Sequence, residues 1–183
     1  MGTRGLWGFK YNNQYKVTYS HSDSYFKELG LNILNLIHSA KTDDKLIEIY
    51  NRICQLNDAD TIDLEDLKIL KEKYNASFDM NTYDYYTAYY ILKDFQTRPD
   101  LLLNEDFYYI LDYNTMYLSL QKDENMVYEY RYLIDLDKQV LLIHSKELEN
   151  NKKEIPLNSI FNLQILFPDN KIYKNALLLG LIK

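Results

Sequence analysis

The first twenty residues alternate between apolar and polar positions, with the period of two that is typical of β-strands. Two strands are predicted, over residues 6–11 and 15–20, and a turn around residues 12–14 joins them. Trp7 and Phe9 fall on the same side of the first strand. We therefore expect a hairpin at the start of the chain, with one side buried against helices.

The next eighty residues follow the helical period of 3.6. Helices are predicted over residues 25–39, from 42 or 43 to 53, from 60 or 61 to 70, and from 82 to a point before Pro99. Ser22 or Ser24 is expected to cap the first of them, because a serine hydroxyl accepts hydrogen bonds from free amide groups at a helix start. Cys54 follows the second segment and is expected on its apolar face, buried and unreactive.

The period returns to two in the second half of the chain. Strands are predicted over residues 107–112, 116–120, 127–136 and 140–144. A polar connection, 146–154, follows them, and the tail is expected to end in a short helix over 176–182. The predicted fold class is α+β, with an antiparallel sheet that includes the N-terminal hairpin and packs against a helical block.

Composition bears on the number of domains, the cellular compartment and the class of partner. The chain of 183 residues is expected to form a single domain over residues 1–183, and it has no apolar run of the length that spans a bilayer. One cysteine cannot form an internal disulfide, which favours the cytoplasm of the host cell. A net charge of −6 argues against a broad nucleic-acid-binding face and favours basic partners. Tyrosine is abundant, with 19 copies, and suits both half-buried strands and interfaces.

Candidate chemistry gathers near the N-terminus, where four of the five glycines fall within thirty residues. Here His21 could act as general acid or base, with Asp23 to orient it, Arg4 to hold a phosphate or an oxyanion, and Tyr25 to donate a hydroxyl. Such a set could cleave RNA without a metal. The alternative is structural: Ser22, Asp23 and Ser24 cap the following helix, and His21 only ends a strand.

Other polar residues give weaker signals. Asp63, Glu65 and Asp66 could line a helix face and bind a metal, but a charge run on a helix is more typical of a solvated face. His38 and His144 have no neighbouring cysteine or histidine and are interpreted as structural. No phosphate-binding loop, dinucleotide fingerprint or zinc motif occurs, so we expect no cofactor and no metal.

Four segments carry a resemblance: Met1–Gly5, Tyr19–Tyr25, Leu29–Gly30 and Tyr132–Asp137. Together they resemble a group of small uncharacterised bacterial, phage and fungal proteins that begin Met-Gly-Thr-Arg-Gly. These proteins resemble the N-terminal-nucleophile hydrolase architecture, in which the first residue of the opening hairpin performs the reaction. The resemblance implies Thr3 as a nucleophile, which needs a cleavage beyond loss of Met1 because Gly2 has no side chain.

Two functions follow. The resemblance to phage proteins, with the small size, the acidity and the tyrosine supply, suggests a phage or mobile-element anti-defence protein. It would inhibit a CRISPR-Cas-type nucleoprotein effector by binding it or by cleaving its guide RNA. The alternative is a small cytosolic hydrolase, a ribonuclease or an amidohydrolase, that uses Arg4, His21 and Asp23. A pocket shared by these residues would favour catalysis, and an exposed tyrosine patch would favour binding.

Overall fold

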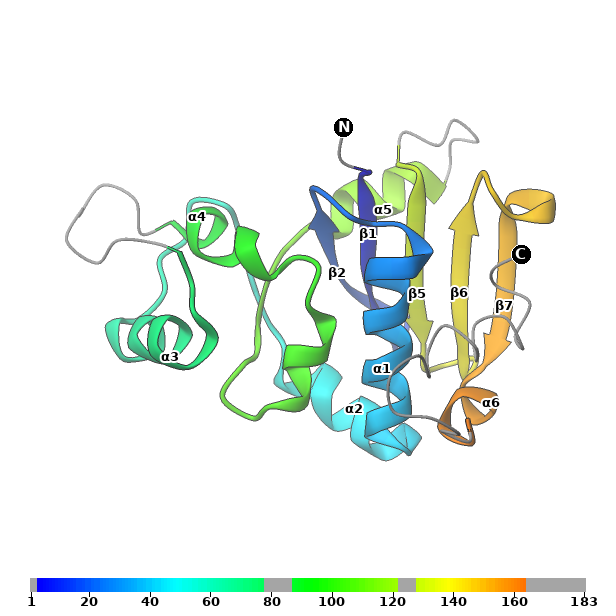
Figure 1. Cartoon of the computed structure of the whole chain (residues 1–183), viewed down its shortest axis with the longest axis horizontal. Coiled ribbons are helices and arrows are strands. Elements are labelled where there is room, and N and C mark those ends of the chain that lie inside the picture. Colours follow the sequence, from blue (N-terminus) through cyan, green and yellow to red (C-terminus); the bar gives the residue numbers. More distant parts are fainter. Residues whose placement is uncertain (1–2, 78–86, 122–127, 164–183) are drawn as a thin grey trace.

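The computed structural model describes residues 3–77, 87–121 and 128–163, and its centre is a five-stranded mixed sheet (Figure 1). The strand order is β2-β1-β5-β6-β7. The strands are β1 (Gly5–Tyr11), β2 (Gln14–Ser20), β5 (Tyr130–Asp135), β6 (Val140–Ser145) and β7 (Lys152–Pro156). The predicted α+β class is confirmed, and so is the place of the N-terminal hairpin within the sheet.

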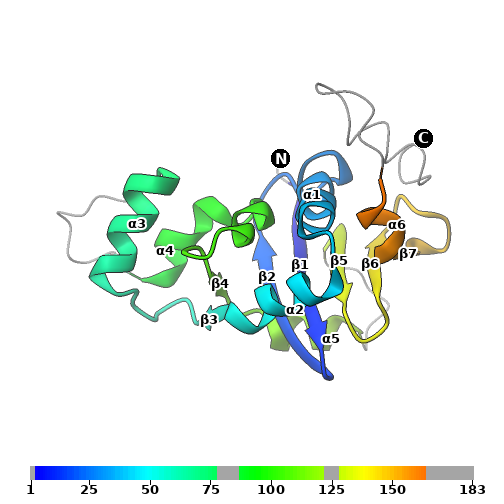
Figure 2. The ribbon, with the colours of Figure 1, turned by 90° about the horizontal axis from the view of Figure 1, so that it is seen from below.

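Helices lie on both sides of this sheet (Figures 1 and 2). A π-helical turn (Phe26–Gly30) leads into α1 (Leu31–Ala40), which lies on the same side as α2 (Asp43–Arg52) and α6 (Leu157–Phe161). Trp7 and Phe9 pack into the large core on this side. On the other side α5 (Asn114–Gln121) covers a smaller core, in which Leu6, Val17, Tyr117 and Leu133 are buried.

The remaining elements form a lobe beside the β2 edge, at the left of Figure 1. They are α3 (Leu64–Tyr74), α4 (Ala88–Leu92), the 3₁₀ turns Lys93–Phe95 and Pro99–Leu103, and a parallel pair of short strands, β3 (Cys54–Leu56) and β4 (Tyr109–Leu111). A third 3₁₀ turn, Glu149–Asn151, precedes β7. The hydroxyls of Tyr108 and Tyr109 donate to the same Asp66 oxygen, at 2.8 and 2.6 Å, and join α3 to β4.

The opening hairpin forms because its turn residues tolerate left-handed backbone. Asn12 and Asn13 have φ of 51° and 59°, which matches the two-residue turn that suits twisted strands. Asp137, in the turn between β5 and β6, accepts from both of their amides, at 2.7 and 3.1 Å. Lys10 lies 3.3 Å from Asp137 and 3.5 Å from Asp135. These contacts tie the two hairpins together at one end of the sheet.

Several elements differ from the sequence prediction. Residues 116–120 belong to helix α5, because the Asn114 side chain pairs with the edge of β2: it accepts from Val17 N at 2.7 Å and donates to Tyr15 O at 2.8 Å. The sheet is not wholly antiparallel, since β1 and β5 run parallel. The segment 146–154, predicted as a connection, contains most of β7. The predicted helix over 176–182 lies outside the described residues.

The sequence predicted the first residue of α2 correctly and that of α3 incorrectly. Thr42 caps α2 as expected, accepting from Lys45 N at 3.2 Å. For α3 the cap is Asp63, which accepts from Glu65 N at 2.8 Å, in place of the expected residue 60 or 61. Cys54 is half-buried in β3 and not on a helix, because α2 ends at Arg52 and Ile53 adopts extended backbone.

His144, on β6, predicts a pH dependence of folding. Burial, with the nearby charges of Arg131 and Lys152, lowers the pKa of His144 to about 4. The unfolded chain then binds the proton more readily, so this contribution to stability is full above pH 6.5 and is lost as the pH falls towards 4. We expect His144→Gln to remove up to about 1.4 kcal/mol of stability change per pH unit in that window. Urea unfolding at pH 4.5 to 7 measures this, and equal slopes for both proteins would contradict it.

Candidate functional site

The predicted site residues gather at the end of the sheet where β1 begins and β2 ends, near the N label in Figure 1. Gly5 pairs with Ser20 on one side and with Tyr130 on the other. The residues just outside this pairing are Arg4 and His21, and both are exposed. The register of the hairpin therefore brings Arg4 and His21 to the same edge, as the sequence suggested.

The sheet divides the remaining predicted residues between its two sides. Tyr19 packs against the smaller core on the α5 side, and its hydroxyl lies 3.0 Å from Nδ1 of His21. Tyr25 lies on the α1 side, where its ring meets that of Tyr130 with the centroids 6.4 Å apart. Asp23 is exposed with φ of 53°, and the His21 ring shares its hydrogen bond with the Tyr19 hydroxyl instead. The five residues do not converge on one point.

Thr3 is 4% exposed, and its hydroxyl has no hydrogen-bond partner among the described residues. A nucleophile must reach its substrate, so in this fold Thr3 would need a rearrangement of the chain around it before it could attack.

Aromatic rings surround Tyr19 on the α5 side. Its ring centroid lies 5.9 Å from that of His21, 5.5 Å from Tyr113 and 5.7 Å from Tyr128. We call these four residues the Tyr19 cluster. The charge of Arg4 acts on two of them, since it opposes the rise in pKa that burial causes in Tyr19 and Tyr128. Arg4 thus stands beside a group of four rings, of which His21 is exposed.

The hydroxyl groups of the cluster have partners. Tyr113 donates to the carboxylate oxygens of Asp58 at 3.3 and 3.4 Å, and Tyr128 donates to the sulfur of Met116 at 2.7 Å. Burial, and then the charge of Asp58, raises the pKa of Tyr113 to about 12. The phenols are therefore protonated at neutral pH and cannot serve as bases. Tyr113 and Tyr128 were missed as site residues, and the tyrosine abundance was the only sequence signal for them.

The loop that carries His21 is held from the α1 side. Ser24 is fully buried, and its backbone oxygen accepts from the Tyr132 hydroxyl at 3.1 Å. The Ser20 hydroxyl donates to the backbone oxygen of Ser22 at 2.9 Å. A Cβ at Gly5 would lie 2.7 Å from Cβ of Ser24, so only glycine allows this approach. The serines therefore order the loop, but the predicted helix cap at Ser22 or Ser24 is wrong: the π-helical turn follows Tyr25, and among the described residues neither this turn nor α1 has a side-chain cap hydrogen bond.

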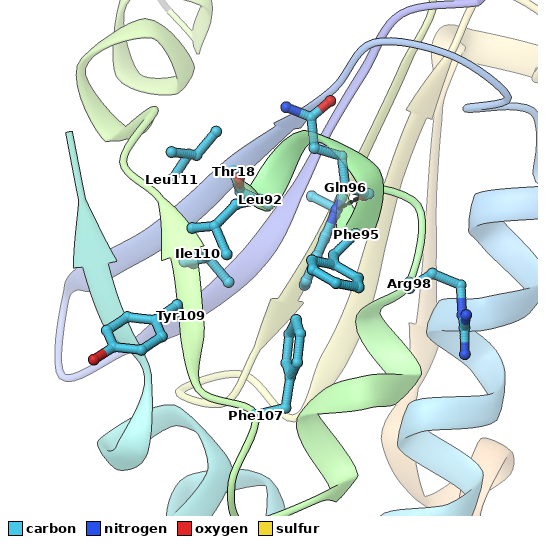
Figure 3. Close-up of a pocket in the computed structure, with 10 residues that line it drawn as sticks. Thr18, Leu92, Phe95, Gln96, Arg98, Phe107, Tyr109, Ile110 and Leu111 are labelled. Atoms are coloured by element: carbon cyan, nitrogen blue, oxygen red, sulfur yellow. Dashed lines mark hydrogen bonds between the residues drawn. The ribbon is translucent and has the colours of Figure 1, made fainter. Parts of the chain in front are cut away.

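Gln96 connects this loop to the lobe. Its side-chain oxygen accepts from His21 N at 3.1 Å, and its backbone oxygen accepts from Trp7 Nε1 at 2.7 Å. Its Nε2 is buried without a partner among the described residues. In Figure 3 the amide group points away from the rings of Phe95 and Phe107. Gln96 positions the His21 backbone, and no sequence pattern marked it.

A cavity of about 10 Å³ lies beneath Gln96, lined by apolar side chains that include Phe95, Phe107 and Leu111 (Figure 3). This volume holds about one water molecule. None of the five predicted site residues lines it. It is therefore too small to be their substrate pocket.

Two of the three acidic residues that were candidates for metal binding have structural roles at α3. Asp63 caps the helix, and Asp66 accepts hydrogen bonds from two tyrosines. Within residues 3–77, 87–121 and 128–163, no group of three His, Cys, Asp or Glu side chains could hold a metal ion. His38 lies 3.1 Å, through Nδ1, from the backbone oxygen of Ile160, which is a structural contact between α1 and α6.

Comparison with known proteins gives no relative: no family model, no curated protein and no solved structure matches the chain. Within the described part of the chain, no helix is long and apolar enough to cross a membrane.

The Tyr19 hydroxyl is expected to set the tautomer of His21. A phenol that donates to Nδ1 leaves the ring proton on Nε2, facing away from Tyr19. We expect the Nε2–H form to dominate the neutral His21 ring, and Tyr19→Phe to give a mixture of the two tautomers. Because the contact is exposed, the substitution should lower the free energy of unfolding by less than about 1 kcal/mol. Nitrogen chemical shifts of the His21 ring measure this. Unchanged shifts in Tyr19→Phe would show that the contact does not orient the ring.

Proposed function

We propose that the protein is a phage or mobile-element anti-defence protein that inhibits a CRISPR-Cas-type nucleoprotein effector by binding it in the host cytoplasm. One observation carries the binding mode: Arg4 and His21 are exposed beside the Tyr19 cluster, and the cavity of about 10 Å³ beneath Gln96 is too small for a substrate. An exposed arginine next to histidine and tyrosine rings is typical of an interaction surface.

The chemistry of this surface suits the RNA component of such a partner. Tyrosine and histidine rings can stack on unpaired bases, and an arginine can pair with the phosphates between them. The rest of the chain has the opposite charge, with a net charge of −6. Acidic surfaces are attracted to the basic protein that holds the RNA. The choice of a CRISPR-type effector rests on the resemblance to phage proteins.

The test uses a reconstituted effector with its guide RNA. We expect the protein to stop cleavage of the target, to co-elute with the effector in gel filtration, and to leave the guide RNA intact on a denaturing gel. Inhibition without co-elution, or no inhibition of any effector type tried, would contradict the proposal.

A second candidate is a metal-independent ribonuclease, and the Tyr19–His21 contact favours it. A histidine held through Nδ1 presents Nε2 for proton transfer, and Arg4 lies at the same edge to stabilise a phosphate. This candidate predicts a shortened guide RNA, cleaved equally well with a metal chelator present, and no cleavage by His21→Asn. An intact guide RNA excludes it.

The amidohydrolase alternative, with Thr3 as the N-terminal nucleophile, has its own test. It requires a mature chain that begins at Thr3, because the free amine of the nucleophile acts as its base. Intact-mass measurement of the purified protein distinguishes this chain from one that begins at Met1 or Gly2. We expect the longer chain, since Thr3 is buried.

A further inference from the structure

A row of residues crosses all five strands on the α5 side of the sheet. Leu6 of β1 pairs with Tyr19 of β2 and with Arg131 of β5, Arg131 pairs with His144 of β6, and His144 pairs with Lys152 of β7. Adjacent strands lie about 4.8 Å apart, so neighbours in such a row lie within reach of one another. The row begins at Tyr19, and its last three members, Arg131, His144 and Lys152, carry nitrogen in their side chains.

The three share one face because side chains alternate along a strand. Leu133 lies in the smaller core with Leu142 packed against it, so Arg131 and His144, each two residues away, are on that same face. In Figures 1 and 2, α5 lies behind β1, β2 and β5, and no other helix among the described elements lies behind β6 and β7. We call Arg131, His144 and Lys152 the cationic row.

Arg131 is a buried charge that no carboxylate in the described part of the chain neutralises. It is 9% exposed, its Nη1 donates to the backbone oxygen of Leu120 at 3.2 Å, and its Nε has no partner among the described residues. The contact with Leu120 places the guanidinium at the end of α5, where the helix favours a cation. Within the described residues a single backbone acceptor serves its five N–H donors, and a buried arginine is normally paired with an anion.

The neighbours of Arg131 bring one carboxylate, that of Glu154, to this face, and it is paired with Lys152. The ring of His144 is half-buried and neutral at pH 7, because burial and the two flanking cations lower its pKa. Lys152 is half-exposed and pairs with Glu154 at 2.8 Å. The charge of Glu154 raises the pKa of His144, against the effect of Arg131 and Lys152. Its carboxylate is paired with Lys152 on β7.

We propose that the cationic row binds a phosphate group. Arg131 and Lys152 supply the charge, and the neutral ring of His144 between them supplies one N–H donor. Phosphate accepts hydrogen bonds on several oxygens at once, which suits donors on neighbouring residues of three adjacent strands. The inference does not depend on the identity of the proposed partner, because free phosphate compounds and the RNA backbone present the same group.

Thermal melts of the full chain in sodium phosphate, against sodium chloride at equal ionic strength, test this directly. A ligand at 100 times its Kd raises Tm by roughly 5 to 10 °C for a domain of this size. We expect a saturable rise, and shifts of the His144 ring signals over the same concentrations. No rise beyond that in chloride, or a rise that does not saturate, would overturn the inference.

Substitutions in β7 test whether the phosphate binds at the cationic row. Lys152→Gln is expected to weaken phosphate binding at least tenfold, and Glu154→Gln to strengthen it, since it frees the Lys152 ammonium. The matched control is Lys153→Gln, which removes the same charge one residue along, on the opposite face of β7. An equal loss in Lys152→Gln and Lys153→Gln would show a general charge effect and contradict the site.

A competition experiment separates the two sources of phosphate. If a short single-stranded RNA binds with the same dependence on Lys152 and is displaced by inorganic phosphate, the row binds the RNA backbone. If RNA binding depends on Arg4 alone and survives phosphate saturation, the row binds free phosphate compounds. RNA binding that fails while phosphate binding persists would contradict RNA recognition at the Tyr19 cluster and leave the cationic row standing.

Discussion

Gly8→Ala is expected to destabilise the fold by about 3 kcal/mol or more, enough to unfold much of the protein at 37 °C. A Cβ at Gly8 would lie 2.1 Å from the backbone oxygen of Lys16 and 2.7 Å from Cα of Val17. Both atoms belong to the backbone of β2, so they cannot move aside as a side chain can. The strands could accept the methyl group only by breaking the pairing of β1 with β2.

Gly30→Ala is the matched control. Its Cβ would lie 2.8 Å from a ring atom of Phe26 and 3.2 Å from the Tyr132 hydroxyl, and both are side-chain atoms that can shift. Alanine also favours the helix that begins there. We expect it to cost less than half as much as Gly8→Ala in urea unfolding followed by circular dichroism. Equal costs, or a Gly8→Ala protein within about 1 kcal/mol of the original, would contradict the close approach of β1 and β2.

Deletion of residues 1–20 is expected to abolish cooperative unfolding altogether. The deletion removes β1 and β2, and β1 pairs with β5 in the middle of the sheet. It also removes Trp7 and Phe9 from the large core, where they are 2% and 0% exposed. Loss of one buried aromatic ring costs about 3 to 5 kcal/mol, so the loss of two costs about as much as the whole stability of a typical domain, and the strand pairing is lost in addition.

Thermal melting followed by both near- and far-ultraviolet circular dichroism measures this. The control is Asn13→Gly, which keeps the hairpin because glycine accepts the left-handed backbone of that turn position. We expect the control to melt sharply and the truncated chain to show no transition. A truncated chain that melts sharply would mean that the hairpin is not part of the cooperative core.

Local patterns predicted what local interactions determine. The Asn-Asn turn and the alternation around Trp7 were enough to predict the hairpin, and Thr42 was enough to predict the start of α2. Helix α5 was mistaken for a strand because its five predicted residues fit both the helical and the strand period. The helix forms because the side chain of Asn114 bonds to β2, which is distant in the sequence. The parallel pairing of β1 with β5 is equally a long-range choice.

For the candidate site, too, the sequence predicted only what local interactions determine. Arg4 and His21 could be brought together from the sequence, because the hairpin register depends on the turn alone. Tyr113, Tyr128 and Gln96 could not, since each reaches the edge from a segment more than seventy residues away from His21. The separation of Tyr25 from His21 by the sheet could not be predicted either, because it depends on the left-handed turn at Asp23.

The most direct test of the proposed interface compares inhibition and stability in Arg4→Ala and His21→Ala. Both residues are exposed, so we expect each variant to unfold within about 0.5 kcal/mol of the original protein and to lose most inhibition of guide-RNA-directed cleavage. The control is Arg98→Ala, which removes an arginine of similar exposure from the lobe, and it should inhibit fully. Full inhibition by both variants would contradict the interface. A loss of roughly 1 to 3 kcal/mol that matches the loss of inhibition would leave Arg4 and His21 a structural role only.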